Sequence, residues 1–483
     1  MNKVVTRFAP SPTGFMHIGG VRTAIFAYLT ARKYGGTFIL RIEDTDKERE
    51  VEGSIEHIQK ALRWLNLEWN YGPDKPGPFG SCIQSERLPT YKEFALKLIE
   101  KGLAYPDPYT AGQVETFRKK AEAEKRPFLY RDHRPKEFGV WDGTKPLRLK
   151  VPEVKRWHWK DAVRGDLEGG EEMLDDFVLI KSDGYPTYNF AHIIDDHLMG
   201  VTHILRADEF ISSTPRFLSL YQALDIEPPV FATLPPILRD DRTKKLGKRD
   251  GAKDVMEYER EGYLSEAMLN YLTLLGWHPS DDREILSLDE ILKEFSLERI
   301  QKAGAVFDEE KLKWFNRQYI LRKSDEEFSE RAQTFLPEWM STKTTAFKRL
   351  LPVLKDKIQV FGEISGLFGE GGELHFIKAL PDYTVELLLW KKNPDRAAAL
   401  ANLNECRDLL GKIRNEDFSA EAVKAAVWPY AEAKGRGEVL WPLRMALTGQ
   451  DKSPDPFVCA AILGKDESLS RIDQAVKKCI SEK

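Results

Sequence analysis

The fold follows from residues 3–42, KVVTRFAPSPTGFMHIGGVRTAIFAYLTARKYGGTFILRI. A short β-branched strand at 3–8 comes first, and Pro10, Pro12 and Gly14 then favour a loop. Apolar side chains recur at helical spacing within 21–34, and two glycines end that helix. A largely apolar strand at 37–42 follows, as expected of a buried parallel strand. The pattern therefore predicts a βαβ unit whose strands end at one edge of a sheet.

Outward from this unit, the next hundred residues alternate less clearly. Helical patterns at 88–101 and 113–125 and a strand-like segment at 147–151 lie in a looser region from about 85 to 185. We interpret this region as an insertion between two halves of a nucleotide-binding fold. Strand and helix alternation then returns, at 186–192, 202–206, 215–223 and 230–233. From about 254 onward strands are scarce, so the last third is expected to be helical, beginning with 264–275 and 288–295.

Length and composition limit the possible classes of protein. The 483 residues allow about three domains. The net charge of −4 excludes attachment to nucleic acid by bulk positive charge, so any such binding needs local basic patches. Four scattered cysteines without a CxxC pair argue against a zinc knuckle or a disulfide framework. Without a long apolar run or a signal-peptide core, the chain is expected to be soluble and cytoplasmic, with no membrane partner.

A candidate phosphate site lies in the loop after the first strand. There His17, Gly19 and Gly20 directly precede a predicted helix. Glycines let a backbone approach a ligand closely, and a helix N-terminus supplies free N–H groups and partial positive charge. A histidine at this position can donate to a phosphate oxygen. The alternative is a tight turn with a surface histidine, and these residues alone leave both readings open.

A second basic element lies at 239–253, where seven positive and three negative side chains surround Gly247. Most charge runs are solvated surface. This one follows a predicted strand, which favours a mobile basic loop that closes on a polyphosphate. Its positive side chains are Arg239, Arg242, Lys244, Lys245, Lys248, Arg249 and Lys253.

A candidate amino-acid site follows from the strand ends. Arg7 lies near the end of the first strand and Glu43 at the end of the next, so both should face one crevice. Arg206 ends another predicted strand. An amino acid with two carboxylates and an ammonium complements two arginines and a glutamate. The alternatives are an Arg–Glu pair that braces the sheet and, for Tyr188, simple core packing.

These residues, in this order, resemble the glutamyl-tRNA synthetases of class I. The strongest motifs are RFAPSPTGFMHIGGVRTA (7–24), LRIEDTD (40–46), QSERLPTY (84–91), KSDGYPTYNFAHIIDDHLMGVTHILRADE (181–209) and KKLGKRDGA (244–252). Weaker matches are VFDEEKLKWFNRQYI (306–320) and PLRMALTG (442–449). The resemblance implies an α/β Rossmann-type catalytic domain with an α+β connective insertion, followed by mostly α-helical stem-contact and anticodon-binding domains. The expected boundaries are 1–85 and 186–240 for the catalytic halves, 86–185 for the insertion, 241–324 for the stem-contact domain and 325–483 for the anticodon-binding region.

The resemblance also implies an activity and its residues. Glutamate and ATP would form glutamyl-adenylate and pyrophosphate, and the 3′ end of tRNA would then take the glutamyl group. The family usually requires bound tRNA even for the first step. Arg7 would hold the side-chain carboxylate and Glu43 the ammonium, and the pocket would be completed by Ser11, Tyr188, His192 and Arg206. ATP would be bound by His17, Gly19, Gly20 and Glu209, with Mg²⁺, and its phosphates by Lys245 and Lys248.

The sequence departs from the family pattern at a few positions. Gly20 replaces the second histidine of the general class signature, which is usual in this subfamily. Gly247 replaces the usual serine of the basic loop, but both lysines remain. His192 stands where asparagine is expected, which implies a changed hold on the carboxylates or pH-sensitive binding. The stretch 105–109 lacks the cysteines that bind zinc in some members, so no structural zinc is predicted.

Several alternatives stay open. Glutaminyl-tRNA synthetases share the catalytic motifs but carry β-barrel anticodon domains, which the helical C-terminal pattern disfavours. A catalytically degenerate tRNA-binding paralogue is disfavoured by the intact motifs. The sequence does not decide whether glutamine acceptor tRNA is charged besides glutamate acceptor tRNA, and monomer is the family default. Base-contacting residues are also undecided, although candidates are Arg414, Trp428, Trp441 and Arg444, whose tryptophans have the alternative of core packing.

Overall fold

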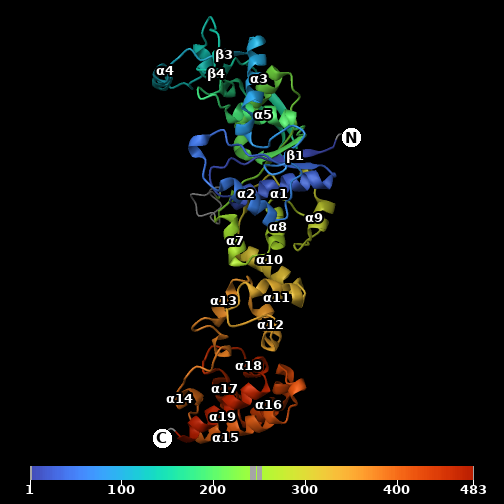
Figure 1. Cartoon of the computed structure of the whole chain (residues 1–483), viewed down its shortest axis with the longest axis vertical. Coiled ribbons are helices and arrows are strands. Elements are labelled where there is room, and N and C mark those ends of the chain that lie inside the picture. Colours follow the sequence, from blue (N-terminus) through green and yellow to red (C-terminus); the bar gives the residue numbers. More distant parts are fainter. Residues whose placement is uncertain (1–2, 240–245, 247–252, 482–483) are drawn as a thin grey trace. The chain divides into compact units, whose positions relative to one another are not determined.

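A computed structural model of the chain describes residues 3–239, 246 and 253–481 (Figure 1). The chain folds into two compact units. Unit 1 consists of Met1–Glu259 and Leu264–Phe315, and unit 2 consists of Arg260–Tyr263 and Asn316–Lys483. Across the described ranges, none of the helices combines the length and the apolar character needed to cross a membrane.

The expected βαβ unit is present at the start of unit 1. Strand β1 (Val5–Phe8) pairs in parallel with β2 (Thr37–Leu40), and helix α1 (Ile18–Lys33) connects them. The helix begins three residues before the predicted start. The reason is a cap: the Nδ1 atom of His17 accepts a hydrogen bond of 3.1 Å from the backbone N–H of Gly19. The cap brings both glycines of the candidate phosphate loop into the first turn of the helix.

The main sheet of unit 1 has six strands in the order β2-β1-β8-β9-β5-β6. Strands β8 (His203–Ala207) and β9 (Val230–Leu234) continue the parallel arrangement beyond β1, and β5 (Trp157–Asp161) is parallel to β9. Only the last strand, β6 (Gly165–Gly169), is antiparallel. The chain leaves β1 for β2 on one side and reaches β8 on the other. In such sheets a ligand crevice forms where the order reverses, here outside the carboxyl ends of β1 and β8.

The β5–β6 hairpin lies within 86–185 and joins the main sheet. Asp161 pairs with Phe231 of β9, and its carboxylate accepts from the backbone N–H and the hydroxyl of Thr233. The other strands of this region form a separate antiparallel sheet, in which β4 (Leu147–Leu149) pairs with β3 (Ala104–Pro106) and β7 (Val178–Ile180). Helix α4 (Ala111–Ala123) lies between β3 and β4 in the sequence.

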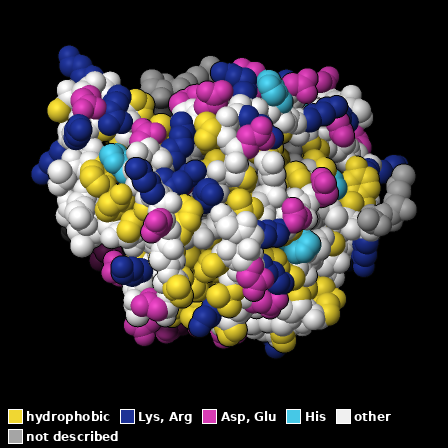
Figure 2. Space-filling view, turned by 90° about the horizontal axis from the view of Figure 1, so that it is seen from above, with side chains coloured by type: hydrophobic (Ala, Val, Ile, Leu, Met, Phe, Trp, Pro, Cys, Tyr) yellow, Lys and Arg dark blue, Asp and Glu magenta, His cyan; other side chains and the backbone are white. Residues whose placement is uncertain are grey.

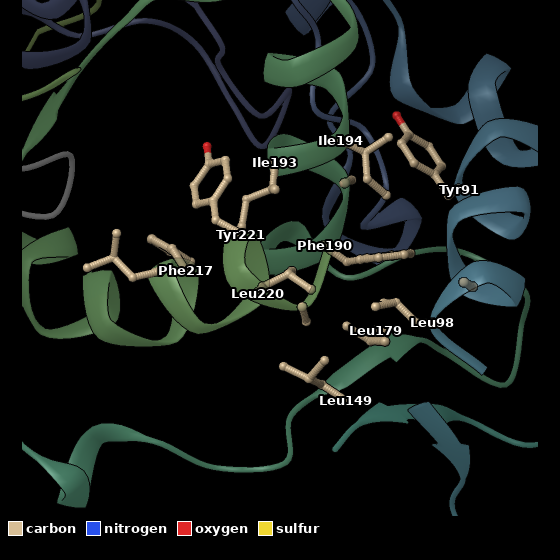
Figure 3. Close-up of a cluster of buried hydrophobic side chains, with 14 of the residues drawn as sticks. Tyr91, Leu98, Leu149, Leu179, Phe190, Ile193, Ile194, Phe217, Leu220 and Tyr221 are labelled. Atoms are coloured by element: carbon tan, nitrogen blue, oxygen red, sulfur yellow. The ribbon is translucent and has the colours of Figure 1, made fainter. Parts of the chain in front are cut away.

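A hydrophobic core joins the main sheet to the insertion sheet. Helices α3 (Leu88–Glu100), α5 (Tyr188–Leu198) and α6 (Thr214–Leu224) point apolar side chains at leucines of β4 and β7 (Figure 3). Each large apolar side chain buried in this way stabilises the fold by about 1.5–3 kcal/mol. The hydroxyls of Tyr91 and Tyr221 point away from those leucines (Figure 3). The helices thus present apolar groups to the core and polar groups to the opposite side.

The remaining elements of unit 1 lie along the second half of its chain, apart from α2. They are α2 (Ser54–Trp64), β10 (Ile237–Leu238), α7 (Val255–Glu261), α8 (Ser265–Leu274), α9 (Leu288–Glu294), β11 (Ala305–Val306) and α10 (Glu309–Arg322). Strands β10 and β11 form a small parallel pair. Helices α7 and α10 contribute residues to both units.

Unit 2 is helical, in agreement with the sequence pattern. Several of its helices begin with a polar cap, such as Asp395 before α15 and Asp455 before α18. Helix α15 packs against α17 and α19. The helices are α11 (Asp325–Gln333), α12 (Thr345–Lys357), α13 (Glu363–Phe368), α14 (Val385–Leu388), α15 (Arg396–Gly411), α16 (Ala420–Lys434), α17 (Arg436–Thr448), α18 (Pro456–Leu463) and α19 (Lys465–Ser481).

Candidate active site

A cavity of about 530 Å³ lies at the crevice expected from the strand order. The carboxyl ends of β1 and β8 form part of its wall, together with the loop that leads into α1. Eight of the candidate residues line it, namely Arg7, Ser11, His17, Gly20, Glu43, Tyr188, Arg206 and Glu209. Positive, negative and neutral donor groups from segments two hundred residues apart therefore surround one space.

A second cavity of about 230 Å³ shares His17, Gly20 and Glu209 with the first. Gly19 lines it as well, along with apolar residues before and within β10. Leu246, which belongs to the basic element, also lines it. The two cavities thus adjoin at the His17 loop. A cavity lined by charged side chains beside a smaller one lined largely by apolar residues is suited to a ligand that has both a charged and an aromatic part.

The His17 loop has the geometry of an anion site. Because Nδ1 of His17 accepts from Gly19, the neutral ring carries its proton on Nε2, the form that donates a hydrogen bond. A Cβ atom at position 19 would lie 2.9 Å from Cε1 of His17, so any larger residue there would require the ring to shift. The loop also leads into the N-terminus of a helix of sixteen residues.

Lys245 and Lys248 lie outside the described residues, but Leu246 between them and the segment after Lys253 are anchored near His17. The backbone N–H of Leu246 donates to the carbonyl of Ile237 at 2.8 Å. On the other flank, Val255 donates from its backbone N–H to the carbonyl of Met16 at 2.9 Å. Asp254 pairs with His17 in an isolated antiparallel bridge and lies 2.6 Å from Nε2 of His57. Leu246 of the basic element and the residues directly after Lys253 are therefore held near the candidate phosphate loop.

Beneath the first cavity, four ionic side chains form a continuous chain of alternating charge. Nε of Arg7 donates to Oδ1 of Asp196 at 3.0 Å, and Nη1 of Arg41 donates to the same oxygen at 2.6 Å. Nη2 of Arg41 then donates to Oε1 of Glu43 at 3.0 Å. We call Arg7, Asp196, Arg41 and Glu43 the pocket chain. Its two end members line the cavity and its two middle members do not.

The charges of the pocket chain support one another. Burial opposes the charged form of Arg41, yet Asp196, Glu43 and Asp195 hold its pKa well above the ordinary value. Burial likewise opposes ionisation of Asp196, but Arg41 and Arg7 hold its pKa below the usual range. For Glu43 burial dominates and raises the pKa, although Arg41 and Arg7 act in the opposite direction. The balance therefore favours the charged forms of Arg41 and Asp196 but opposes the charged form of Glu43.

Two further candidates, Tyr188 and His192, lie near Arg206. Burial lowers the pKa of Arg206 to about 10, and its guanidinium lies against the rings of three phenylalanines. Tyr188 stacks on His192, which lies behind it rather than on the wall of either cavity. Nδ1 of His192 is 2.7 Å from the Tyr188 carbonyl, and burial lowers the pKa of this ring to about 3. His192 is thus neutral near pH 7, which removes its own titration as a source of pH-sensitive binding there.

Sequence reasoning did not identify Arg41 and Asp196. Both are buried, and they are 155 positions apart in the chain. A signal was present, because charged residues interrupt apolar segments at both places: Arg41 in FILRI and Asp196 in AHIIDDHL. Such residues are rarely buried without a partner. The sequence did not reveal which partner each would take.

Among the residues that the structure describes, no group of three or more His, Cys, Asp or Glu side chains is arranged to hold a metal ion. All four cysteines are buried and unpaired by disulfides. Burial raises the pKa of Cys82 to about 11 and that of Cys406 to about 12, so these thiols stay protonated near pH 7.

Two family models match the chain. The catalytic domain of class I tRNA synthetases (E and Q) matches residues 3–314, and an anticodon-binding domain matches 327–476. The chain is 40% identical over 494 residues to a glutamate–tRNA ligase of Moorella thermoacetica and 39% over 491 residues to one of Clostridium acetobutylicum, covering 99% of both chains each time. It is also similar to the crystal structure of a glutamate tRNA ligase from Elizabethkingia meningosepticum in complex with its amino acid, with a TM-score of 0.86, 35% identity and 99% of each chain covered.

Proposed function

Because the chain belongs to the family of class I tRNA synthetases for glutamate and glutamine, we propose that it ligates L-glutamate to the 3′ end of tRNA, using ATP and a glutamyl-adenylate intermediate. One observation carries the proposal: Arg7, Glu43 and His17 line a single cavity at the switch point of the main sheet. The similar ligases and the solved structure are named for glutamate, which supports glutamate over glutamine as the amino acid.

In this proposal the first cavity binds the amino acid. Arg7 holds the side-chain carboxylate. Its Nε donates to Asp196, and this bond fixes the orientation of the guanidinium whose terminal nitrogens would bind the carboxylate. Glu43 holds the ammonium group. The pocket is completed by Ser11, Tyr188, His192 and Arg206, of which His192 acts through the Tyr188 ring that it stacks on.

ATP is proposed to lie beside it, against His17, Gly19, Gly20 and Glu209, with Lys245 and Lys248 at its phosphates. An oxygen of the glutamate α-carboxylate attacks the α-phosphorus, and the bond to pyrophosphate breaks. The attacking group is already ionised, so the step needs no base. It needs alignment and compensation of negative charge, which the Nε2–H of His17 supplies.

Mg²⁺ is proposed to accompany ATP and to neutralise charge on the phosphates. This ion usually keeps several waters and binds substrate phosphates rather than a cage of protein ligands. That preference fits a site in which the described side chains offer no cluster of three ligands. What the chain itself supplies is the orientation of His17 and the helix N-terminus behind it.

The acceptor end of tRNA is proposed to bind at the insertion and the anticodon at unit 2, where an anticodon-binding model matches. Figure 2 shows Lys and Arg side chains gathered among hydrophobic ones on a face of the molecule. Helix α4 of the insertion exposes Arg118, Lys119 and Lys120. The ring of Phe117 on the same helix stacks on His133 at 4.1 Å between centroids. Cations beside aromatic rings suit single-stranded RNA ends.

The deciding experiment is ATP–pyrophosphate exchange with glutamate, measured with and without tRNA. We expect exchange with glutamate and none with glutamine. The His17→Ala variant should lose about 10²–10³ in rate, because it lacks one donor to the transition state. No exchange by the wild type under either condition would overturn the proposal and favour an RNA-binding paralogue without catalysis. Exchange with glutamine alone would move the chain to the glutaminyl branch.

Whether glutamine acceptor tRNA is also charged is tested by aminoacylation of separate glutamate and glutamine tRNA transcripts.

We propose a monomer that acts in the cytoplasm, where tRNA is charged for translation. Sedimentation of the full chain at a mass near 55.4 kDa would agree with the monomer, and a doubled mass would contradict it.

A further inference from the structure

The pocket chain has a feature that a bracing ion pair would not need. Two guanidinium groups, those of Arg7 and Arg41, share the same oxygen of Asp196, at 3.0 and 2.6 Å. The other oxygen, Oδ2, is buried and has no hydrogen-bond partner among the described residues. Any shift or rotation of Asp196 therefore moves both arginines together. The arrangement couples the two guanidiniums instead of maximising the number of bonds.

The same chain connects a positive and a negative group at the cavity wall. Arg7 and Glu43 line the cavity, whereas Arg41 and Asp196 are fully buried behind them. Arg41 contacts Asp196 with one terminal nitrogen and Glu43 with the other. A planar guanidinium has a rigid fork, so it fixes the separation of the two carboxylates that it joins. The distance between the Arg7 and Glu43 side chains is thus set by the buried side chains of Arg41 and Asp196.

Resting on the proposed function, we propose that the buried Asp196–Arg41 pair is the spacer that sets the length of the amino-acid side chain accepted by the pocket. Arg7 takes the distal carboxylate and Glu43 the ammonium, and an amino acid bridges them best when its own span equals their separation. Aspartate is one methylene shorter, so it engages both ends only with strain. Arg41 and Asp196 are positioning residues, because neither touches the ligand.

A neighbouring arginine provides a matched control. Arg87 is buried and donates from Nε to Oδ1 of Asp195 at 2.8 Å, next to Asp196 in sequence. Its other bonds go to the carbonyls of Phe79 and Ser81, and it does not line the cavity. Replacing Arg87 with lysine removes a buried fork of the same kind, but at the side of the network that does not join Arg7 to Glu43.

The experiment compares Arg41→Lys with Arg87→Lys at saturating tRNA. For each variant, exchange gives KM for glutamate, aspartate and ATP, and thermal unfolding gives Tm. Lysine keeps the positive charge but lacks the fork. We expect Arg41→Lys to raise KM for glutamate about 10–100-fold and to lower the preference for glutamate over aspartate about tenfold, with KM for ATP changed by less than about twofold. Arg87→Lys should lower Tm and leave KM for glutamate within about twofold.

The spacer proposal would be overturned if the two variants changed KM for glutamate equally. It would also be overturned if Arg41→Lys raised KM for glutamate and KM for ATP equally. If Arg41→Lys does not fold, Asp196→Asn decides, since it keeps the shape and an oxygen but weakens both arginine contacts. Shifts of Tm by added glutamate or aspartate measure the same preference without catalysis. A wild type that is stabilised by glutamate but lacks exchange would therefore sink the proposed function while leaving the spacer intact.

Discussion

Unit 1 contains two buried networks of arginine and carboxylate, one beneath the first cavity and one inside the insertion, and they differ in how completely their oxygens are bonded. In the insertion, Oδ1 of Asp176 accepts from Nη2 of Arg134 at 2.7 Å and from the backbone N–H of Val151 at 3.0 Å. Its Oδ2 accepts from Tyr105 and from Nε of Arg134, both at 2.8 Å. Both oxygens of this carboxylate are thus fully used.

Asp107 is bonded just as completely. Its Oδ2 accepts from Nε of Arg148 at 2.6 Å, and its Oδ1 accepts from the Tyr130 hydroxyl and from the N–H of Tyr109 at 3.0 Å. We call this network the insertion cluster, with members Tyr105, Asp107, Tyr130, Arg134, Arg148 and Asp176. It joins four chain segments and lines neither of the two cavities beside His17. The pocket chain instead ends at the cavity and leaves an oxygen of Asp196 unbonded. A closed network serves stability, whereas a network that ends in Arg7 and Glu43 on a cavity wall keeps two charged groups for a ligand.

The largest expected effect comes from removing the cavity end of the pocket chain. In Arg7→Ala the glutamate carboxylate loses its charged partner and Asp196 loses one of two, so kcat/KM for glutamate in exchange should fall about 10²–10³-fold. KM for ATP should change little. Urea unfolding should show a smaller loss of stability, because Arg41 still neutralises Asp196.

The matched change in the insertion cluster is Arg134→Ala. It leaves Asp176 buried without its bidentate partner, so unfolding free energy should fall by about 3–5 kcal/mol while KM for glutamate at saturating tRNA stays within about twofold. Similar kinetic losses in both variants would break the distinction between an open and a closed network.

The contrast also explains what the sequence predicted and what it did not. The α/β fold with a helical C-terminal region is confirmed, since strand and helix periodicities are local signals. The strand-end rule likewise predicted that Arg7, Glu43 and Arg206 would meet, and they line one cavity. Their roles stay predictions.

The local sequence patterns did not predict which distant side chains and strands pair with one another. The sharing of Asp196 by Arg7 and Arg41 depends on where α5 packs over the ends of β1 and β2, which no periodicity encodes. The β5–β6 hairpin lies within the expected insertion, 86–185, and no sequence pattern singled it out. It joins the main sheet through Asp161 and Phe231, a contact between segments seventy residues apart. Lys245 and Lys248 lie outside the described residues, so their convergence on His17 stays a prediction supported by the anchored flanks.

A smaller effect is expected from pH. Burial raises the pKa of Glu43 above its ordinary value of 4.5, with Arg41 and Arg7 opposing the shift. A protonated Glu43 is neutral and loses its attraction for the ammonium group. KM for glutamate should therefore rise as the pH falls through the raised pKa, by up to about tenfold per unit below it.

One observation and one variant identify Glu43 as the group whose titration raises KM for glutamate. His192 has a pKa lowered to about 3 by burial, so it stays neutral throughout this range. The Glu43→Gln variant should bind glutamate weakly and with no dependence on pH above about 5, since the substrate side chain titrates near 4.3. A pH limb that persists in Glu43→Gln would assign the titration to another group.

The smallest expected effect is that of a chelator on the insertion. If the insertion cluster holds segments 105–109, 130–134, 148–151 and 175–176 together, prolonged dialysis against EDTA should leave Tm unchanged within about 1 °C. The same treatment applied to Arg134→Ala should also change nothing beyond the lower starting Tm. A loss of several degrees, restored by zinc, would show that a metal stabilises this region. The stability of the insertion would then depend on a bound metal. The insertion cluster would no longer be a network that is complete without a ligand.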